Sequence, residues 1–163
     1  MQANLRAVTP GDAQALCDIY NHYIVHSTIT FEQEVVTAQQ MQERIVATTG
    51  QYPWLVAEVN GKLIGYAYAT RWRSRAAYDH TVESTIYLSP DGTGRGLGLP
   101  LYQALMDALR ERGVHAVVGC IALPNPGSAA LHEKCGFEKV GHFPQVGRKF
   151  GEWIDVGFWQ RLL

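Results

Sequence analysis

The most informative stretch of this chain reads Ser89-Pro90-Asp91-Gly92-Thr93-Gly94-Arg95-Gly96-Leu97-Gly98. It lies between an apolar run typical of a strand, residues 84–88, and a helical pattern over residues 99–112. Glycines let backbone N–H groups converge, and a helix start adds unpaired N–H groups and a positive dipole end. This order predicts a cradle for a phosphate or pyrophosphate; the alternative is a flexible turn before a helix.

Three kinds of glycine loop can be compared with this stretch. A P-loop needs Lys followed by Ser or Thr after its last glycine, and none follows here, which argues against a Mg-nucleotide hydrolase. The dinucleotide fingerprint belongs at the first strand of a βαβ unit, whereas this loop lies past the middle of the chain. The third pattern, Gln/Arg-x-x-Gly-x-Gly/Ala, is matched by Gly96 and Gly98, with Thr93 at the Gln/Arg position.

The loop therefore resembles the acyl-CoA-binding loop of the GNAT superfamily of N-acyltransferases. The resemblance implies that its main chain holds the pyrophosphate of acetyl-CoA and that Arg95 supplies a cation. Thr93 removes one long polar side chain and leaves the main-chain cradle intact. The residues implied to bind the co-substrate here are Thr93, Gly94, Arg95, Gly96, Leu97 and Gly98.

A second segment, residues 125–137, resembles the Asn-x-x-(small)-x-x-x-Tyr-x-x-x-Gly-Phe helix of the same superfamily. The resemblance implies that Asn125 contacts the pantetheine arm and that Ser128 lies beside the CoA phosphates. His132 occupies the position at which a tyrosine acid is usual. An imidazole can donate a proton to a departing thiolate, so His132 is a candidate general acid. A capped histidine on a helix surface is the structural alternative.

Attack on a thioester also requires a base, because an amine is mostly ammonium at neutral pH. Glu83 is the best candidate, since it lies in an otherwise apolar strand pattern that leads into the cradle. A carboxylate in such a run either forms an ion pair or has a functional role. The alternative to catalysis is a structural ion pair with an arginine.

Longer matches narrow the family. Residues 72–87 and 151–160 look like the phosphinothricin and methionine sulfoximine acetyltransferases, and the similarity extends over most of the chain. It implies a homodimer, a role in herbicide or antibiotic detoxification, and no metal. It also assigns the base to Glu83 and puts His132 near the reacting groups. Implied main-chain contacts to pantetheine come from Ile86, Tyr87 and Leu88, and implied substrate contacts from Arg73, Arg75, Tyr78 and Glu83.

The substrate assignment also has a physical basis. Phosphinothricin and methionine sulfoximine are amino acids with a carboxylate and a polar tetrahedral head, which arginine recognises well. Arg71, Arg73 and Arg75 alternate, and on an extended strand all three would share one face. A solvated basic sheet edge is the alternative.

Composition sets further limits. The 163 residues predict one domain, 1–163, with 47% hydrophobic and 18% charged residues and a net charge of −1. The sequence has no basic run of the kind that binds nucleic acid. It also has no apolar window long enough for a membrane span and no apolar core of a signal peptide, so we expect a cytoplasmic protein. Three widely spaced cysteines predict buried free thiols, and the histidines lack metal-ligand spacing.

The pattern of elements predicts the order β-α-α-β-β-β-α-β-α-β-β. This order suits an α/β (α+β) fold of the GNAT type, in which helices flank a mixed, mostly antiparallel sheet. Thr9 is the expected cap of the first helix, and Asn60-Gly61 is the expected type I′ turn. The predicted strands are 3–8, 54–59, 62–70, 81–88, 115–121, 137–143 and 154–160.

Two other functions remain open. The same fold could act on a different amine, such as a peptide N-terminus, a polyamine or an aminoglycoside, although arginines near the site disfavour polycations. The chain could also be a non-catalytic acyl-CoA or anion-binding module that keeps the cradle.

Overall fold

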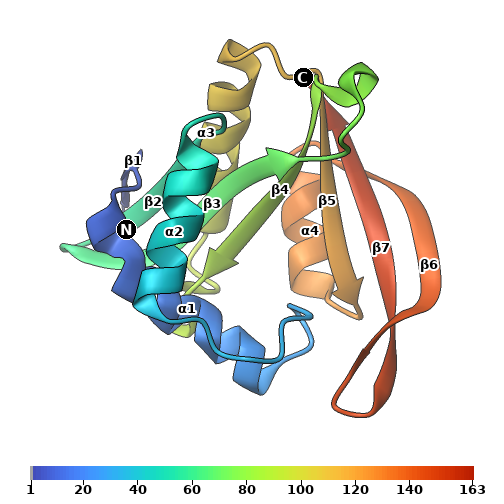
Figure 1. The fold of residues 1–163 in the computed structure, drawn as a ribbon, viewed down its shortest axis with the longest axis horizontal. Coiled ribbons are helices and arrows are strands. Elements are labelled where there is room, and N and C mark those ends of the chain that lie inside the picture. Colours follow the sequence, from blue (N-terminus) through green and yellow to red (C-terminus); the bar gives the residue numbers. More distant parts are fainter. Residues whose placement is uncertain (1) are drawn as a thin grey trace.

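The computed structural model describes residues 2–163, which form one seven-stranded sheet with four α-helices packed on it (Figure 1). The predicted order of elements is confirmed. In chain order the elements are β1 (Asn4–Ala7), α1 (Ala13–His26), α2 (Ala38–Thr49), β2 (Trp54–Val59), β3 (Lys62–Arg71), β4 (Thr81–Leu88), α3 (Gly98–Glu111), β5 (Ala116–Leu123), α4 (Pro126–Lys134), β6 (Glu138–Lys149) and β7 (Glu152–Leu162).

The sheet has the order β1-β2-β3-β4-β5-β7-β6, and every neighbouring pair is antiparallel except β4 and β5. This confirms the mixed, mostly antiparallel sheet. The parallel pairing is short, because it joins only Thr81–Ser84 to Ala116–Gly119. Beyond those residues β4 stays paired with β3 while β5 stays paired with β7, so the two strands run apart (Figure 1).

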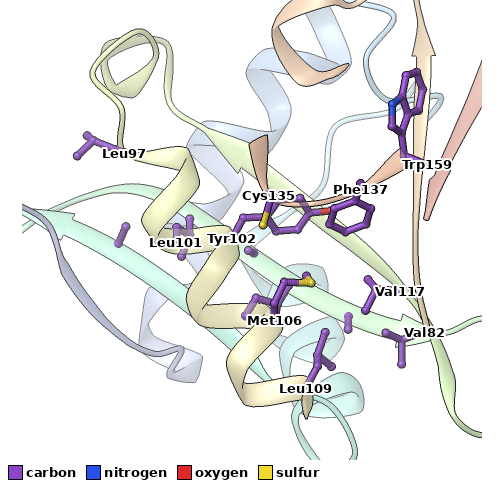
Figure 2. Packing of buried hydrophobic residues seen from close by; sticks show 14 of the residues in the cluster. Val82, Leu97, Leu101, Tyr102, Met106, Leu109, Val117, Cys135, Phe137 and Trp159 are labelled. Atoms are coloured by element: carbon purple, nitrogen blue, oxygen red, sulfur yellow. The ribbon is translucent and has the colours of Figure 1, made fainter. Parts of the chain in front are cut away.

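Two hydrophobic clusters cover the two faces of the sheet. On one face α3 packs Tyr102 and Met106 against strand residues such as Val117 (Figure 2). On the other face α1 and α2 pack against a second set that includes Trp54 and Tyr66. The helices bury one stripe each, as their spacing of apolar residues predicts. The central strands are therefore fixed from both sides.

Turn and capping residues mark the ends of several helices and strands. Asn60 and Gly61 have φ values of 52° and 78°, so the predicted type I′ turn between β2 and β3 is confirmed. The Thr37 hydroxyl caps α2 by accepting the N–H of Gln40. Thr9 differs from the prediction: it forms a capping box with Asp12 on a short 3₁₀ turn, and α1 begins only at Ala13.

The last two strands are longer than predicted. They form one hairpin that turns at Phe150 and Gly151, both with positive φ. Pro144 and Gly147 interrupt the strand pattern in the sequence, but a register shift between Phe143 and Gly147 absorbs them in β6. Within residues 2–163, no helix is both long and apolar enough to cross a membrane.

Candidate active site

A pocket opens where β4 and β5 diverge. The last paired residues are Ser84 and Gly119, and they form the apex of this opening. The loop between α1 and α2 closes one side. The pocket is lined by Ile29, Thr30, Phe31, Glu83, Ser84, Thr85, Ile86, Tyr87, Cys120, Ile121, Ala122, His132 and Val156.

Neighbouring residues of β4 face opposite sides of the sheet. Glu83 lies opposite Thr70 of β3, and Tyr87, four residues further along β4, lies opposite Tyr66. Because Tyr66 and Tyr87 pack with α1 and α2, Glu83 belongs to the same face of the sheet. Ser84 lies opposite Ala69 and belongs to the α3 face. The pocket thus touches both faces at one point of one strand.

Glu83 lies at the apex of the pocket. Its carboxylate lines the pocket, and none of the ion pairs among residues 2–163 involves it, so the alternative of a structural pair with arginine is not what the structure shows. The thiol of Cys120 donates a hydrogen bond to Oε1 of Glu83 at 3.4 Å. The carboxylate therefore keeps acceptor capacity for a ligand.

Cys120 corrects the prediction of three buried cysteines. All three thiols are free, and Cys17 and Cys135 are buried, but Cys120 is exposed. It falls in an apolar strand pattern, yet its strand has left β4 and the side chain faces the opening. Desolvation and the Glu83 carboxylate raise the pKa of this thiol to about 12.

His132 lies on the other side of the apex and is buried, so it is not a histidine on a helix surface. Its Nδ1 is 2.8 Å from the carbonyl oxygen of Ser128, and its Nε2 is 3.0 Å from the Tyr102 hydroxyl. Burial lowers its pKa, which favours the neutral imidazole. A Cβ at Gly119 would lie 2.6 Å from Nε2, so only glycine leaves room for the ring.

The glycine loop follows the open end of β4. Gly94 and Gly96 have φ values of 73° and 72°, and nothing lies within 4 Å of where their Cβ atoms would be. The Thr93 hydroxyl instead bonds back to the carbonyl of Pro90 at 2.9 Å. Buried Leu97 anchors the loop, and α3 starts at Gly98. The predicted combination of strand, loop and helix is therefore present.

Arg95 belongs to a different surface of this loop. It lines a hollow with Lys62, Asp91 and the turn at Asn60, away from the residues that line the opening between β4 and β5.

The predicted main-chain contacts fall on the free edge of β4. Ile86 and Tyr87 line the pocket, and past Ser84 the edge toward β5 has no strand partner in the described residues. The Leu88 carbonyl is already engaged by the hydroxyl of Tyr23. Peptide groups along such an edge need a partner, which a ligand can provide.

Asn125 and Ser128 are both fixed by α4. The Asn125 side chain caps the helix by accepting the N–H of Ser128 at 3.1 Å, and Pro126 starts it. Because the Ser128 carbonyl orients His132, this helix start also sets the position of the imidazole.

The substrate residues predicted from alternation are placed differently. β3 ends at Arg71, and residues 72–75 leave the sheet, so Arg73 and Arg75 do not share the face of a strand with Arg71. Arg71 bonds to the carbonyls of Arg73 and Ser74 and organises this loop. Serine and alanine neighbours, with no β-type pattern, could have signalled the loop.

Arg73, Arg75 and Tyr78 are exposed and do not line the pocket. Arg73 stacks on the Trp72 ring at 4.7 Å, and its positive charge offsets a small part of the rise in the pKa of Cys120. Arg73 lies in the loop between β3 and β4.

The loop between α1 and α2 was missed by sequence reasoning. The carbonyl of Thr30 accepts a bond from the buried Lys149 ammonium at 2.8 Å, and the Thr30 hydroxyl bonds Tyr20 at 2.8 Å. The Phe31 ring packs where a Cβ of Gly147 would lie. Because these partners are up to 119 residues apart, no local pattern reveals the wall that they hold.

Within residues 2–163, no three His, Cys, Asp or Glu side chains gather in a way that could hold a metal ion. The site therefore consists of a carboxylate, a thiol, a buried imidazole and free peptide groups.

Comparison with known proteins agrees with this arrangement. Residues 5–157 match the family described as the acetyltransferase (GNAT) domain. The chain is 46% identical over 157 residues to phosphinothricin N-acetyltransferase of Streptomyces viridochromogenes, covering 96% of this chain and 86% of the relative. It is 36% identical over 162 residues to the L-methionine sulfoximine/L-methionine sulfone acetyltransferase of Pseudomonas aeruginosa, covering 98% and 94%. The structure of a phosphinothricin acetyltransferase from Sinorhizobium meliloti in complex with acetyl-CoA has a TM-score of 0.96 and 36% identity, covering 100% of this chain and 89% of that one.

Proposed function

Because the chain belongs to the GNAT family of acetyl-CoA-dependent N-acetyltransferases, we propose that it acetylates the α-amino group of amino-acid analogues such as phosphinothricin, methionine sulfoximine or methionine sulfone. The observation that carries the proposal is Glu83: a carboxylate without an ion pair, at the apex of an opening beside β4, the strand that leads into the glycine loop. The names of the relatives supply the substrate class.

Acetyl-CoA supplies the acetyl group as a thioester. Three features favour its binding in the opening. Residues 93–98 offer a loop with open glycines, and residues 86–88 offer a strand edge not paired with β5. Asn125 and Ser128 begin α4, the helix that carries His132 to the pocket. Peptide N–H groups and a helix start suit the phosphates of CoA.

Glu83 is the proposed base. It takes a proton from the acceptor ammonium, directly or through water, and so produces the free amine that can attack. A main-chain N–H at the β4 edge stabilises the negative charge that develops on the thioester oxygen. His132 is the proposed source of the proton that the leaving sulfur needs.

Arg73, Arg75 and Tyr78 are proposed to bind the acceptor. They gather in the loop before β4, and the charge of Arg73 acts at Cys120 inside the pocket. Guanidinium groups bind a carboxylate or phosphinate with paired N–H groups, so one of these arginines would hold the acceptor carboxylate at the mouth.

We further propose one catalytic domain over residues 1–163, a homodimer, and detoxification in the cytoplasm. The proposal of a dimer is supported by the hairpin of β6 and β7, where Phe143, Val146, Phe150 and Trp153 are each more than half exposed. Val146→Asp should yield monomers in light scattering. Val46→Asp, equally exposed on α2, should leave the mass unchanged, and monomeric wild-type protein would refute the dimer.

The test of function is release of CoA thiol from acetyl-CoA with a panel of amines. The expected result is turnover of phosphinothricin, methionine sulfoximine or methionine sulfone, with the α-N-acetyl product identified by mass spectrometry. Stronger turnover of a peptide N-terminus or a polyamine would show that the acceptor is another kind of amine and not an amino-acid analogue. Binding of acetyl-CoA without transfer to any amine would identify a non-catalytic module.

A further inference from the structure

A chain of hydrogen bonds links His132 to the apex of the opening. The Ser84 hydroxyl lies 2.5 Å from the Tyr102 hydroxyl, which lies 3.0 Å from His132 Nε2. Ser84, Tyr102 and His132 are only 5%, 0% and 4% exposed, yet Ser84 and His132 line the pocket. The chain therefore joins a titratable group in the core to the place where β4 and β5 separate.

The partners of His132 fix the direction of these hydrogen bonds. The Ser128 carbonyl can only accept, so Nδ1 carries the proton. In the neutral ring Nε2 is then an acceptor, and the Tyr102 hydroxyl donates to it. Because the Tyr102 hydrogen is used in this bond, Ser84 donates its own hydrogen to the Tyr102 oxygen. The Ser84 oxygen can then accept a hydrogen bond from another group. In this state the chain can receive a proton at Ser84.

We propose that Ser84, Tyr102 and His132 form a proton relay that takes a proton from the acceptor amine and returns it to the leaving sulfur. The inference rests on the proposed acetyl transfer and refines the role of His132. Ser84 would touch the reacting atoms, and Tyr102 would pass protons between Ser84 and the imidazole without touching the substrate.

The proton balance closes with this relay. Transfer forms an N–C bond and breaks the C–S bond, the ammonium loses two protons, and the sulfur gains one. Glu83 passes the first proton to solvent. The second moves from the nitrogen to Ser84 while Ser84 protonates Tyr102 and Tyr102 protonates His132 Nε2. When the C–S bond breaks, the same three protons move back, and Ser84 protonates the sulfur.

Geometry favours a relay over direct donation by the imidazole. Nε2 is occupied by Tyr102 and Nδ1 by Ser128, so neither nitrogen is free to bond to a ligand without breaking a buried bond. The attacking nitrogen and leaving sulfur bind the same carbon, so one hydroxyl can serve both in turn. The absence of a Cβ at Gly119 lets His132 approach the apex.

Tyr102→Phe and Ser84→Ala test the relay, because each removes one hydroxyl. Each should lower kcat by about 10²-fold, the scale of one acid–base contribution, with little change in the KM for acetyl-CoA. The double variant should lose no more than either single variant, since the groups act as one unit. Tyr52→Phe, a tyrosine packed against the same core cluster, is the control and should keep full activity.

A second readout does not depend on acetyl transfer. Nitrogen NMR of ¹⁵N-histidine-labelled wild-type protein should show His132 neutral at pH 7.5, with the proton on Nδ1. In Tyr102→Phe, Nε2 should shift because it loses its donor. Full kcat in Tyr102→Phe, additive losses in the double variant, or a proton on Nε2 would each overturn the relay. Failure of the amino-acid acceptors alone would refute the proposed substrate, and the kcat comparison would use whichever panel amine turns over.

Discussion

The two faces of the sheet at the apex differ in how they are built. The Glu83 face is open, and its wall comes from a loop after α1 and a hairpin at the end of the chain. The Ser84 face is closed, because α3 packs Tyr102 and its apolar neighbours on the sheet (Figure 2), and the Ser84 hydroxyl bonds to Tyr102 there. One face can adapt to an acceptor, whereas the other holds a fixed set of hydrogen bonds. Two consecutive residues thus enter two different environments.

The largest effect should come from removing the base on the open face. Glu83→Gln keeps the size of the side chain but cannot take a proton, so kcat/KM should fall by about 10²- to 10⁴-fold. The measurement is the pH profile of thiol release, in which residual activity should rise at high pH as free amine accumulates. Glu111→Gln, an exposed change at the end of α3, is the control. Unchanged kcat/KM across the profile would show that another group is the base.

The second-largest loss of activity is expected from a change on the Ser84 face. Gly119→Ala places a Cβ 2.6 Å from His132 Nε2, in a position where the ring must move. We expect kcat to fall by about 10- to 100-fold, because a displaced imidazole loses its geometry. Gly50→Ala, where nothing lies within 4 Å, should have no effect on kcat. Equal activity of the two variants would mean that the position of His132 is unimportant.

A smaller effect is expected on the open face, and it should be specific to the acceptor. Gly147→Ala places a Cβ 2.5 Å from the Phe31 ring, which would swing away from the wall of the pocket. The KM for the acceptor should rise by about 3- to 10-fold, which is the scale of a lost apolar contact. The KM for acetyl-CoA should stay constant. Gly141→Ala, with its nearest neighbour at 3.9 Å, is the matched control; if both variants behave alike, Phe31 does not contact the acceptor.

The smallest effect concerns stability. Because burial lowers the pKa of His132 below its ordinary 6.5, the unfolded chain binds a proton at this residue more readily than the folded chain does. The free energy of unfolding should therefore decrease as the pH falls below 6.5, until the folded-state pKa is passed. The slope contributed by one such group is at most about 1.4 kcal/mol per pH unit. Urea unfolding at several pH values should show a weaker dependence for His132→Gln, and identical slopes would contradict a depressed pKa.

Structural features that depend only on residues close together in the sequence could be predicted. The glycine loop, the Asn60-Gly61 turn and the cap at Asn125 depend on neighbours within a few positions, and the structure places all three as expected. The location of Glu83 in a pocket could be predicted for a similar reason, because a carboxylate is conspicuous in an apolar strand.

Residues that act through distant partners could not be predicted. Tyr102 follows Leu101 and precedes Leu105 at helical spacing, so its pattern indicates only core, and its bond to Ser84 depends on how α3 crosses the sheet. The wall at Thr30 and Phe31 depends on a hairpin more than a hundred residues away. The alternation of Arg71, Arg73 and Arg75 was misleading because a bend after Arg71 removes the strand on which it was based.

The protonated state of Cys120 has a chemical consequence for an enzyme that handles thioesters. A thiolate would attack a bound acetyl thioester by transthioesterification, a nearly isoenergetic exchange that would leave the enzyme acylated on cysteine. A pKa of about 12 keeps this sulfur almost entirely in the thiol form at neutral pH, and a thiol is a poor nucleophile. The same Glu83 carboxylate that is proposed to activate the amine accepts the hydrogen bond of that thiol, so with the proposed base role one group would both promote N-acetylation and disfavour self-acylation.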